Sequence, residues 1–405
     1  MRFAHLADCH IGAWKDPKLR TVNTKAFERA IDMCIEKQVD FIVIAGDLFN
    51  TSMPAIDELK VVVKKLKTLK DNQIPVYLIA GSHDFSPSGK TMLDVLESAG
   101  LFINVAKGET VGSKLKLHFT IDRKTKAKIT GMIGKRGSLE KKYYEDLMWE
   151  NLEKESGYKI FVFHSLLSEL KPKELEAAES QPLSLLPKHF NYYAGGHPHF
   201  VFHTQEKGYG TIAYPGPLFP NNFKELEQLE RGGFYIVEDD TLHFEPIQIY
   251  NTFHIHIDCD HKTPEEVKDK ILKDISNKEF INTIVTIRLF GILESGKQSD
   301  IGIKEIFDQL YDKGAYFVMK NMNALTTKEF EEIKVSSGSV EEIEKAVIKE
   351  HLGQADLKGM NAEKQEALIQ TLIQILSAEK DEGEKVADFE NRITSETDKV
   401  FKLID

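Results

Sequence analysis

Metal-binding side chains follow five apolar segments of this chain, each at the point where a predicted strand ends. These residues share the ability to hold a cation or to transfer a proton: Asp8, His10, Asp47, His83, Asp84, His164, His197 and His199. Because the carboxyl ends of parallel strands meet at one edge of an open α/β sheet, residues far apart in sequence converge there. The sequence therefore predicts a single site at one sheet edge.

The apolar segments alternate with segments of helical pattern. Strands are predicted over residues 2–7, 41–46 and 76–81, and helices near residues 22–38, 55–70 and 90–99. After residue 100 the predicted strands become shorter and more frequent, with one helical segment between them. This mixture indicates an α/β fold, in which two mixed β-sheets pack together and are flanked by helices as a four-layer sandwich.

The strand and helix pattern starts again after residue 250. The order strand, helix, strand, helix, strand predicts a second, small α/β domain over residues 251–332, behind a first domain over residues 1–250. Residues 333–339 are rich in serine and predict a linker. Residues 340–405 are charged and carry apolar positions at helical spacing, which predicts a helical segment.

Composition restricts where this chain works and what it binds. We expect a cytoplasmic protein, because no segment approaches the roughly 20 apolar residues of a membrane span and the start lacks a signal-peptide pattern. The three cysteines have no paired spacing, which argues against disulfides and zinc knuckles. Residues 251–405 carry −10 of the net charge of −11, so the C-terminal helices are a poor surface for DNA and a better one for a protein.

The residue types at the strand ends favour a catalytic metal site. Mixed carboxylate and imidazole ligands suit manganese, iron or zinc, and a carboxylate such as Asp47 can bridge two ions that activate water and clamp a phosphate. Any one motif has a simpler interpretation, in which the aspartate caps a helix and the histidine packs in the core. The order of all five motifs together favours a binuclear site for phosphoester hydrolysis.

The motifs resemble those of the calcineurin-like metallophosphoesterases. The resemblance rests on five short segments: Asp8-Cys9-His10, Gly46-Asp47, Gly81-Ser82-His83-Asp84, His164 and Gly196-His197-Pro198-His199. Within that superfamily, the segments RFAHLADCHIG, GDLFN and YPGPLFP and the added α/β unit are similar to the DNA double-strand-break repair nucleases of the SbcD and Mre-eleven type, archaeal in character.

The resemblance implies a role for each site residue. One of two Mn²⁺ ions, for which Mg²⁺ or another divalent ion can substitute, would be held by Asp8, His10, Asp47 and His199. The other would be held by Asp47, Ser82, His164 and His197. The resemblance further implies that His83 is the general acid for the leaving oxygen and that Asp84 orients it.

Two positions depart from the family pattern. Ser82 stands where the family usually has asparagine, and a hydroxyl is a shorter and poorer ligand than an amide carbonyl. Asn50 stands where the nucleases commonly have a histidine that positions the phosphate, and asparagine can hydrogen-bond a phosphate but carries no charge.

The resemblance also implies partners. These are DNA, a second copy of the chain through the helices near residues 55–70 and 90–99, and an SMC-like coiled-coil ATPase of the SbcC or Rad-fifty type bound by residues 340–405. The expected activity is single-strand endonuclease and 3′-to-5′ exonuclease in a nucleoid-associated cytoplasmic protein. Two alternatives stay open: a phosphoesterase for small nucleotides, and a scaffold that tethers DNA with weak catalysis.

Overall fold

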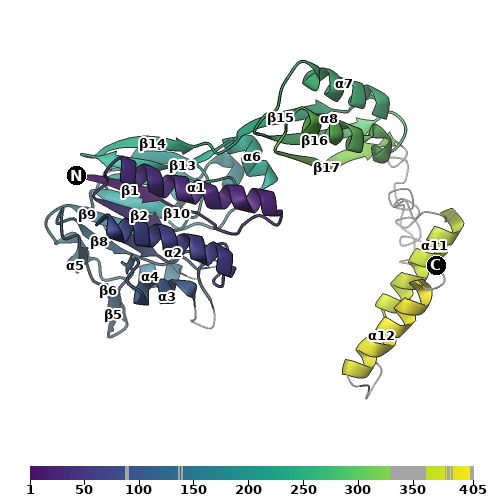
Figure 1. Ribbon diagram of the computed structural model, residues 1–405. Coiled ribbons are helices and arrows are strands. Elements are labelled where there is room, and N and C mark those ends of the chain that lie inside the picture. The colour runs from purple at the N-terminus through teal and green to yellow at the C-terminus, as the bar shows by residue number, and fades with distance from the viewer. Residues whose placement is uncertain are drawn as a thin grey trace. The chain divides into compact units, whose positions relative to one another are not determined.

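The computed structural model describes most of the chain and divides it into two compact units (Figure 1). The residues described are 1–86, 91–135, 137, 140–328, 362–378, 380, 384 and 386–401. The first unit holds residues 1–253 and 282–286, and the second holds the remainder. The predicted linker, 333–339, and residues 340–361 of the predicted helical segment lie outside the described residues.

The first unit contains a six-stranded mixed sheet around the N-terminal strand. Its order is β14 (Thr241–Ile247), β13 (Gly232–Glu238), β1 (Arg2–Leu6), β2 (Phe41–Ala45), β3 (Val76–Ile79) and β4 (Ile103–Asn104). Strands β1 to β4 run parallel to one another, and β13 runs antiparallel to β1 with Phe3 opposite Val237. The carboxyl ends of β1, β2 and β3 therefore lie at one edge.

A second six-stranded sheet repeats this arrangement. Its order is β11 (Phe202–Gln205), β12 (Thr211–Tyr214), β10 (Tyr192–Gly196), β9 (Lys159–His164), β8 (Lys128–Gly131) and β7 (Thr120–Ile121). Strands β8, β9, β10 and β12 are parallel, with Gly196 opposite His164. A separate hairpin joins β5 (Gly108–Val111) and β6 (Lys114–Leu117).

The two sheets pack face to face. Alternate residues of each strand point into one core, which is built from Phe3, Phe41, Val43 and Tyr77 of the first sheet and Ile129, Ile160, Val162 and Tyr192 of the second. Burial of these large side chains is the main term that holds the sheets together.

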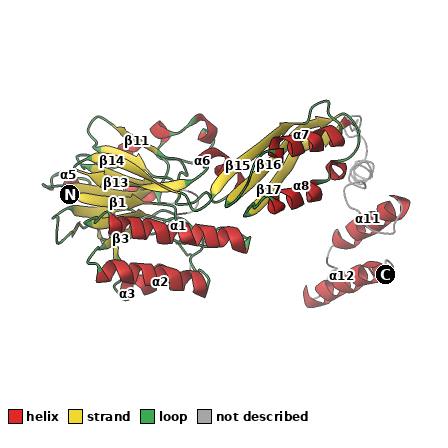
Figure 2. Cartoon of the chain, turned by 45° about the horizontal axis from the view of Figure 1, so that its top comes forward, coloured by secondary structure: helices red, strands yellow, loops and turns green. Residues whose placement is uncertain are grey.

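Helices cover the outer face of the first sheet, as Figure 2 shows for α1 (Pro17–Glu36) and α2 (Ile56–Asp71). Helix α1 begins earlier than the apolar pattern predicted. The Asp16 side chain accepts hydrogen bonds from the N–H groups of Lys18 and Leu19, and Pro17 occupies the first turn, where its missing N–H costs nothing. Helix α3 (Met92–Ser98) is shorter.

Short helices and turns cover the outer face of the second sheet. They are α4 (Lys141–Glu145), α5 (Glu150–Glu153) and three 3₁₀ turns at residues 168–170, 173–175 and 183–185. A second core of buried aromatic and aliphatic side chains, among them Tyr144, Phe161 and Tyr193, lies beneath them. Helix α6 (Phe223–Leu229) precedes β13. The first unit is thus an α/β structure with mixed sheets.

The second unit is built on a three-stranded sheet of order β15 (Asn251–Asp258), β16 (Thr283–Leu293) and β17 (Phe317–Thr327). Helices α7 (Pro264–Ser276) and α8 (Ile303–Asp312) and a 3₁₀ turn (Gln298–Ile301) accompany it. Farther along the chain, α11 (Ala362–Leu376) and α12 (Val386–Phe401) pack against each other. Within the described residues, no helix combines the length and the apolar character that crossing a membrane requires.

Candidate metal centre

The ends of β1, β2, β9 and β10 bring the predicted ligands to one place in the first unit. Asp8 and His10 follow β1, Asp47 follows β2, and His164 is the last residue of β9. The turns after β1 and β2 are joined by backbone hydrogen bonds, from Asp8 N to Gly46 O at 3.2 Å and from His10 N to Asp47 O at 2.9 Å. These bonds fix the two turns in register.

Four site residues have a left-handed backbone that is unusual for residues other than glycine. The φ angles are 49° at Asp8, 42° at His10, 52° at Asp47 and 94° at His197. Gly81 lets the turn after β3 approach, because a Cβ there would lie 2.3 Å from Asp47 Oδ1. Such backbone strain is common where a site needs side chains aimed from tight turns.

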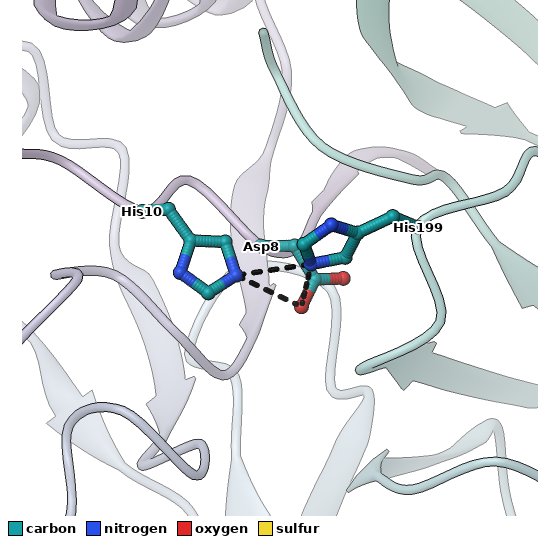
Figure 3. A group of neighbouring side chains, drawn as sticks. All are labelled: Asp8, His10 and His199. Atoms are coloured by element: carbon teal, nitrogen blue, oxygen red, sulfur yellow. Dashed lines mark hydrogen bonds and ion pairs between the residues drawn. The ribbon is translucent and has the colours of Figure 1, made fainter. Parts of the chain in front are cut away.

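The first group of ligand atoms comes from Asp8, His10 and His199. The two Nε2 atoms of His10 and His199 lie 3.0 Å apart, and Asp8 Oδ1 lies 3.9 Å and 3.8 Å from them (Figure 3). Two imidazole nitrogens at this distance require a proton or a cation between them. The Asp8 carboxylate is held by the His197 N–H, which lies 3.1 Å from each of its oxygens.

Asp47 connects this group to a second one. Its Oδ2 lies 3.5 Å from His10 Nε2 and 3.2 Å from His164 Nε2, while its Oδ1 accepts a 2.7 Å hydrogen bond from the His83 N–H. The described residues contain three groups of three side chains, and within each group the potential ligand atoms lie within 4.8 Å of one another. The groups are Asp8, His10 and His199; His10, Asp47 and His83; and Asp8, Asp47 and His164. A carboxylate shared in this way is suited to bridge two ions.

Burial and charge make this cluster suitable for cations. Asp8 is fully buried, and this burial raises its pKa to about 6. Burial opposes protonation of His164, but the charge of Asp47 and then that of Asp8 outweigh it and raise the pKa of His164 to about 10. His164 Nε2 is buried and lies 3.2 Å from Asp47 Oδ2. The residues therefore fit divalent ions, and imidazole with carboxylate is a donor set that manganese, iron and zinc accept.

Two imidazoles are oriented by acceptors behind them. His164 Nδ1 lies 2.8 Å from the Ala45 carbonyl oxygen, and His199 Nδ1 lies 3.0 Å from Glu225 Oε1. Both acceptors hold one proton on Nδ1, so that a bound cation can replace the proton on Nε2 and use that nitrogen as its ligand.

Sequence reasoning missed Glu225. It lies in the first turn of α6, where Asn222 caps the helix through a 3.0 Å hydrogen bond from the Glu225 N–H. An asparagine followed three residues later by glutamate has the spacing of an ordinary helix start, which hides its second role. A carboxylate in the first turn of the helix that follows the His197 and His199 motif was the available signal.

The structure brings Ser82 and His197 to the border of the cluster. The Ser82 hydroxyl donates to Asp47 Oδ2 at 3.4 Å, and the ring centroid of His197 lies 5.2 Å from that of His164. His197 does not belong to the three compact groups of His, Asp, Glu and Cys side chains found among the described residues. The set proposed for the first ion is therefore more tightly assembled than the set proposed for the second.

The structure places His83 beside the cluster but does not pair it with Asp84. His83 Nδ1 lies 2.8 Å from the Asn50 carbonyl oxygen, so the orienting acceptor of His83 is Asn50 rather than the expected Asp84. The buried Asp84 carboxylate instead accepts hydrogen bonds from the N–H groups of Leu48, Phe49 and Gly81, at 3.1, 3.0 and 3.1 Å. It ties the turn after β2 to the turn after β3.

Comparison with known proteins identifies the class to which this geometry belongs. Residues 1–200 match the family model described as calcineurin-like phosphoesterase. This segment contains all the clustered ligands named above. The chain is a calcineurin-like metallophosphoesterase, and thus a metal-dependent phosphoesterase.

The more particular likeness is to proteins named DNA double-strand break repair protein Mre11. The Archaeoglobus fulgidus protein is 26% identical over 88% of this chain and 82% of its own length. The Methanopyrus kandleri protein is 31% identical over 59% of this chain and 54% of its own, and the Methanocaldococcus jannaschii protein is 26% identical over 67% and 70%. The chain is a homologue of these archaeal Mre11 proteins and aligns with about half to four fifths of their length.

Proposed function

We propose that this chain is a manganese-dependent DNA nuclease that hydrolyses phosphodiester bonds in double-strand-break repair, as a single-strand endonuclease and a 3′-to-5′ exonuclease. The observation that carries the proposal is the convergence of imidazole nitrogens on the carboxylates of Asp8 and Asp47. The choice of DNA as substrate is supported by the relatives, which are named for double-strand-break repair.

The chain's own residues divide into two proposed sets around Asp47. Asp8, His10 and His199 would hold one ion, and His164, His197 and Ser82 the other, with Asp47 shared. When bound, the two ions supply a nucleophilic water at neutral pH and neutralise charge on the phosphate. The protein fixes the ligands through the Ala45 carbonyl and Glu225, whose hydrogen bonds keep each Nε2 directed at the cluster.

His83 is the proposed general acid. Its Nδ1 is occupied by the Asn50 carbonyl, which leaves Nε2 to give a proton to the leaving oxygen. The backbone of Asn50 therefore has a defined part in the site, and its amide side chain is the proposed phosphate contact.

The remaining parts of the chain have proposed supporting roles. We assign residues 1–250 as a four-layer nuclease domain, residues 251–332 as a unit that orients DNA, and residues 340–405 as the segment that binds an SMC-like ATPase. The apolar side chains of Ile56 and Val95 are 82% and 57% exposed, which supports a homodimer through α2 and α3. We place the complex in the cytoplasm, associated with the nucleoid.

A direct test compares the purified chain and Asp47→Ala on hairpin, single-stranded and blunt-ended DNA with manganese, magnesium or chelator. Loss of the bridging carboxylate should abolish metal-dependent cleavage, because both ligand sets include Asp47. Asp71→Ala, which changes an exposed aspartate at the end of α2, is the matched control and should cleave normally. Equal cleavage by Asp47→Ala and the parent would refute this mechanism.

One observation favours a second candidate, a DNA-tethering scaffold with weak catalysis. Ser82 donates its hydroxyl to Asp47 and offers no amide carbonyl as a ligand. Under this alternative, Ser82→Asn would raise a low manganese-dependent activity, whereas an efficient nuclease would gain little. Turnover of nucleotide diesters without cleavage of any DNA would instead indicate a small-nucleotide phosphoesterase.

A further inference from the structure

Helix α1 has a polar residue, Asn23, at a position on its buried face. The other buried positions of this helix are all apolar: Leu19, Val22, Ala26, Phe27, Ala30, Ile31, Met33 and Cys34. The Asn23 side chain is 0% exposed. A buried amide costs free energy unless its oxygen and its nitrogen are both hydrogen-bonded, so the partners of Asn23 indicate its role.

Both polar atoms of Asn23 bind the backbone of the turn that follows β1. Asn23 Nδ2 donates to the Cys9 carbonyl oxygen at 3.0 Å, and the Gly12 N–H donates to Asn23 Oδ1 at 3.3 Å. Cys9 and Gly12 flank His10 in the sequence. One side chain of α1 therefore holds the backbone before and after His10.

The same turn is also held by the turn after β2. The N–H groups of His10 and Ile11 donate to the carbonyl oxygens of Asp47 and Leu48, at 2.9 and 3.1 Å. The turn is thus fixed by two elements, by the chain after β2 through its backbone and by α1 through the single side chain of Asn23.

His10 depends on its backbone for orientation more than His164 and His199 do. Those two imidazoles each have an acceptor behind Nδ1. His10 Nδ1 is buried and has no hydrogen-bond partner among the described residues. The backbone of His10 has a φ of 42°, in the left-handed region that residues other than glycine occupy only where their surroundings enforce it. The two hydrogen bonds of Asn23 provide such an enforcing contact.

We propose that Asn23 is a positioning residue that preorganises His10 as a metal ligand before a cation binds. The inference rests on the proposed function, in which His10 belongs to the ion position that includes His199. Without the two hydrogen bonds the turn is free to leave its left-handed conformation, and a cation must then order it on binding. The cost of this ordering appears as weaker affinity at the ion position of His10.

The test measures manganese binding by titration calorimetry in the metal-free parent, Asn23→Leu and Asn23→Thr. Leucine keeps the branched shape of asparagine but has no hydrogen-bonding atom. Threonine carries one polar atom in place of two, so it replaces at most one of the two hydrogen bonds. The NMR signal of His10 Cε1–H in the metal-free proteins reports whether the imidazole keeps its surroundings.

Asn151→Leu is the matched control. Asn151 lies on α5, and its Nδ2 donates to the Leu117 carbonyl oxygen of β6 at 3.1 Å, so the variant also removes a hydrogen bond from an amide to the backbone. That hydrogen bond does not involve a turn of the metal centre. We expect the control to unfold at a lower temperature while both manganese affinities and the His10 signal stay as in the parent.

We expect the tighter of the two manganese affinities to fall by about 10- to 100-fold in Asn23→Leu and by less in Asn23→Thr, while the weaker affinity stays within about twofold. The His10 signal should shift or broaden in both variants. If Asn23→Leu does not fold, Asn23→Thr alone decides the question. Unchanged affinities in a folded Asn23 variant that is merely less stable would overturn the proposal. Absence of manganese binding by the parent would instead overturn the proposed function.

Discussion

At the scale of single residues, the centre is defined as much by the groups behind the ligands as by the ligands themselves. The Nδ1 of His164 is hydrogen-bonded to a backbone carbonyl, and the Nδ1 of His199 is hydrogen-bonded to the carboxylate of Glu225. A carboxylate acceptor makes an imidazole a stronger ligand than a neutral carbonyl does, because it stabilises positive charge on the ring. The two proposed ion positions should therefore differ in affinity.

Glu225→Gln tests this difference. The amide keeps the shape of the side chain but loses its charge, so we expect the tighter of two manganese affinities to fall by about 10- to 100-fold. Titration calorimetry of the metal-free protein measures it. Glu230→Gln, which changes an exposed glutamate at the end of α6, should leave both affinities unchanged. Equal affinities for the parent and Glu225→Gln would show that the Glu225 carboxylate does not strengthen His199 as a ligand.

At the scale of elements, the site depends on turns that are locked to one another. The Asp84 carboxylate accepts hydrogen bonds from backbone N–H groups of the turns after β2 and β3. These two turns carry Asp47 and His83. A side chain that satisfies three buried backbone donors determines where both turns lie. Asp84 would therefore affect catalysis only through the positions of Asp47 and His83.

Asp84→Asn is expected to lower the free energy of unfolding. The amide offers one acceptor oxygen in place of two and adds N–H donors beside N–H donors, so about 1–3 kcal/mol should be lost. Urea denaturation of the metal-free protein gives this value, and Asp71→Asn serves as the exposed control. A change below the error of the control would mean that the three hydrogen bonds contribute little.

The elements also show what could be predicted from the sequence. The strands that precede Asp8 and Asp47 and the strand that ends in His164 were recognised, because short apolar segments next to polar motifs have few other interpretations. The partner of His83 was predicted wrongly, because adjacency in sequence suggested Asp84, whereas the fold brings the Asn50 carbonyl to within 2.8 Å of His83 Nδ1. Glu225 was missed, because its place in the first turn of α6 is that of an ordinary helix start, and its contact with His199 depends on how α6 approaches the loop after β10.

At the scale of the whole molecule, the core between the sheets contains a buried histidine that influences acid stability. His5 is fully buried on β1, with Nδ1 2.9 Å from the Tyr192 hydroxyl, and burial lowers its pKa to about 3. The unfolded chain binds a proton at His5 below its ordinary pKa, whereas the folded chain does not until much lower pH. Stability from this residue is therefore present at neutral pH and lost as pH falls from about 6.5 towards 3.

This sign gives a measurable difference. Between pH 5.5 and 4.5 the free energy of unfolding of the parent, relative to His5→Leu, should fall by about 1.4 kcal/mol, which corresponds to one proton. Denaturation of both metal-free proteins at the two pH values measures it. A difference that does not change with pH would mean that His5 is protonated within the folded core.

The left-handed backbone at His197 affects which substitutions at this position are favourable for stability. His197 is exposed and has a φ of 94°, a conformation that only glycine adopts freely. His197→Gly and His197→Ala both remove the imidazole, yet the glycine variant should be more stable than the alanine variant by about 1 kcal/mol. Thermal unfolding of the two metal-free variants tests this, and equal stability would contradict it. Selection for heat resistance alone would thus favour glycine at this position and remove a proposed ligand, so that durability and catalysis select for different residues at the same place in the chain.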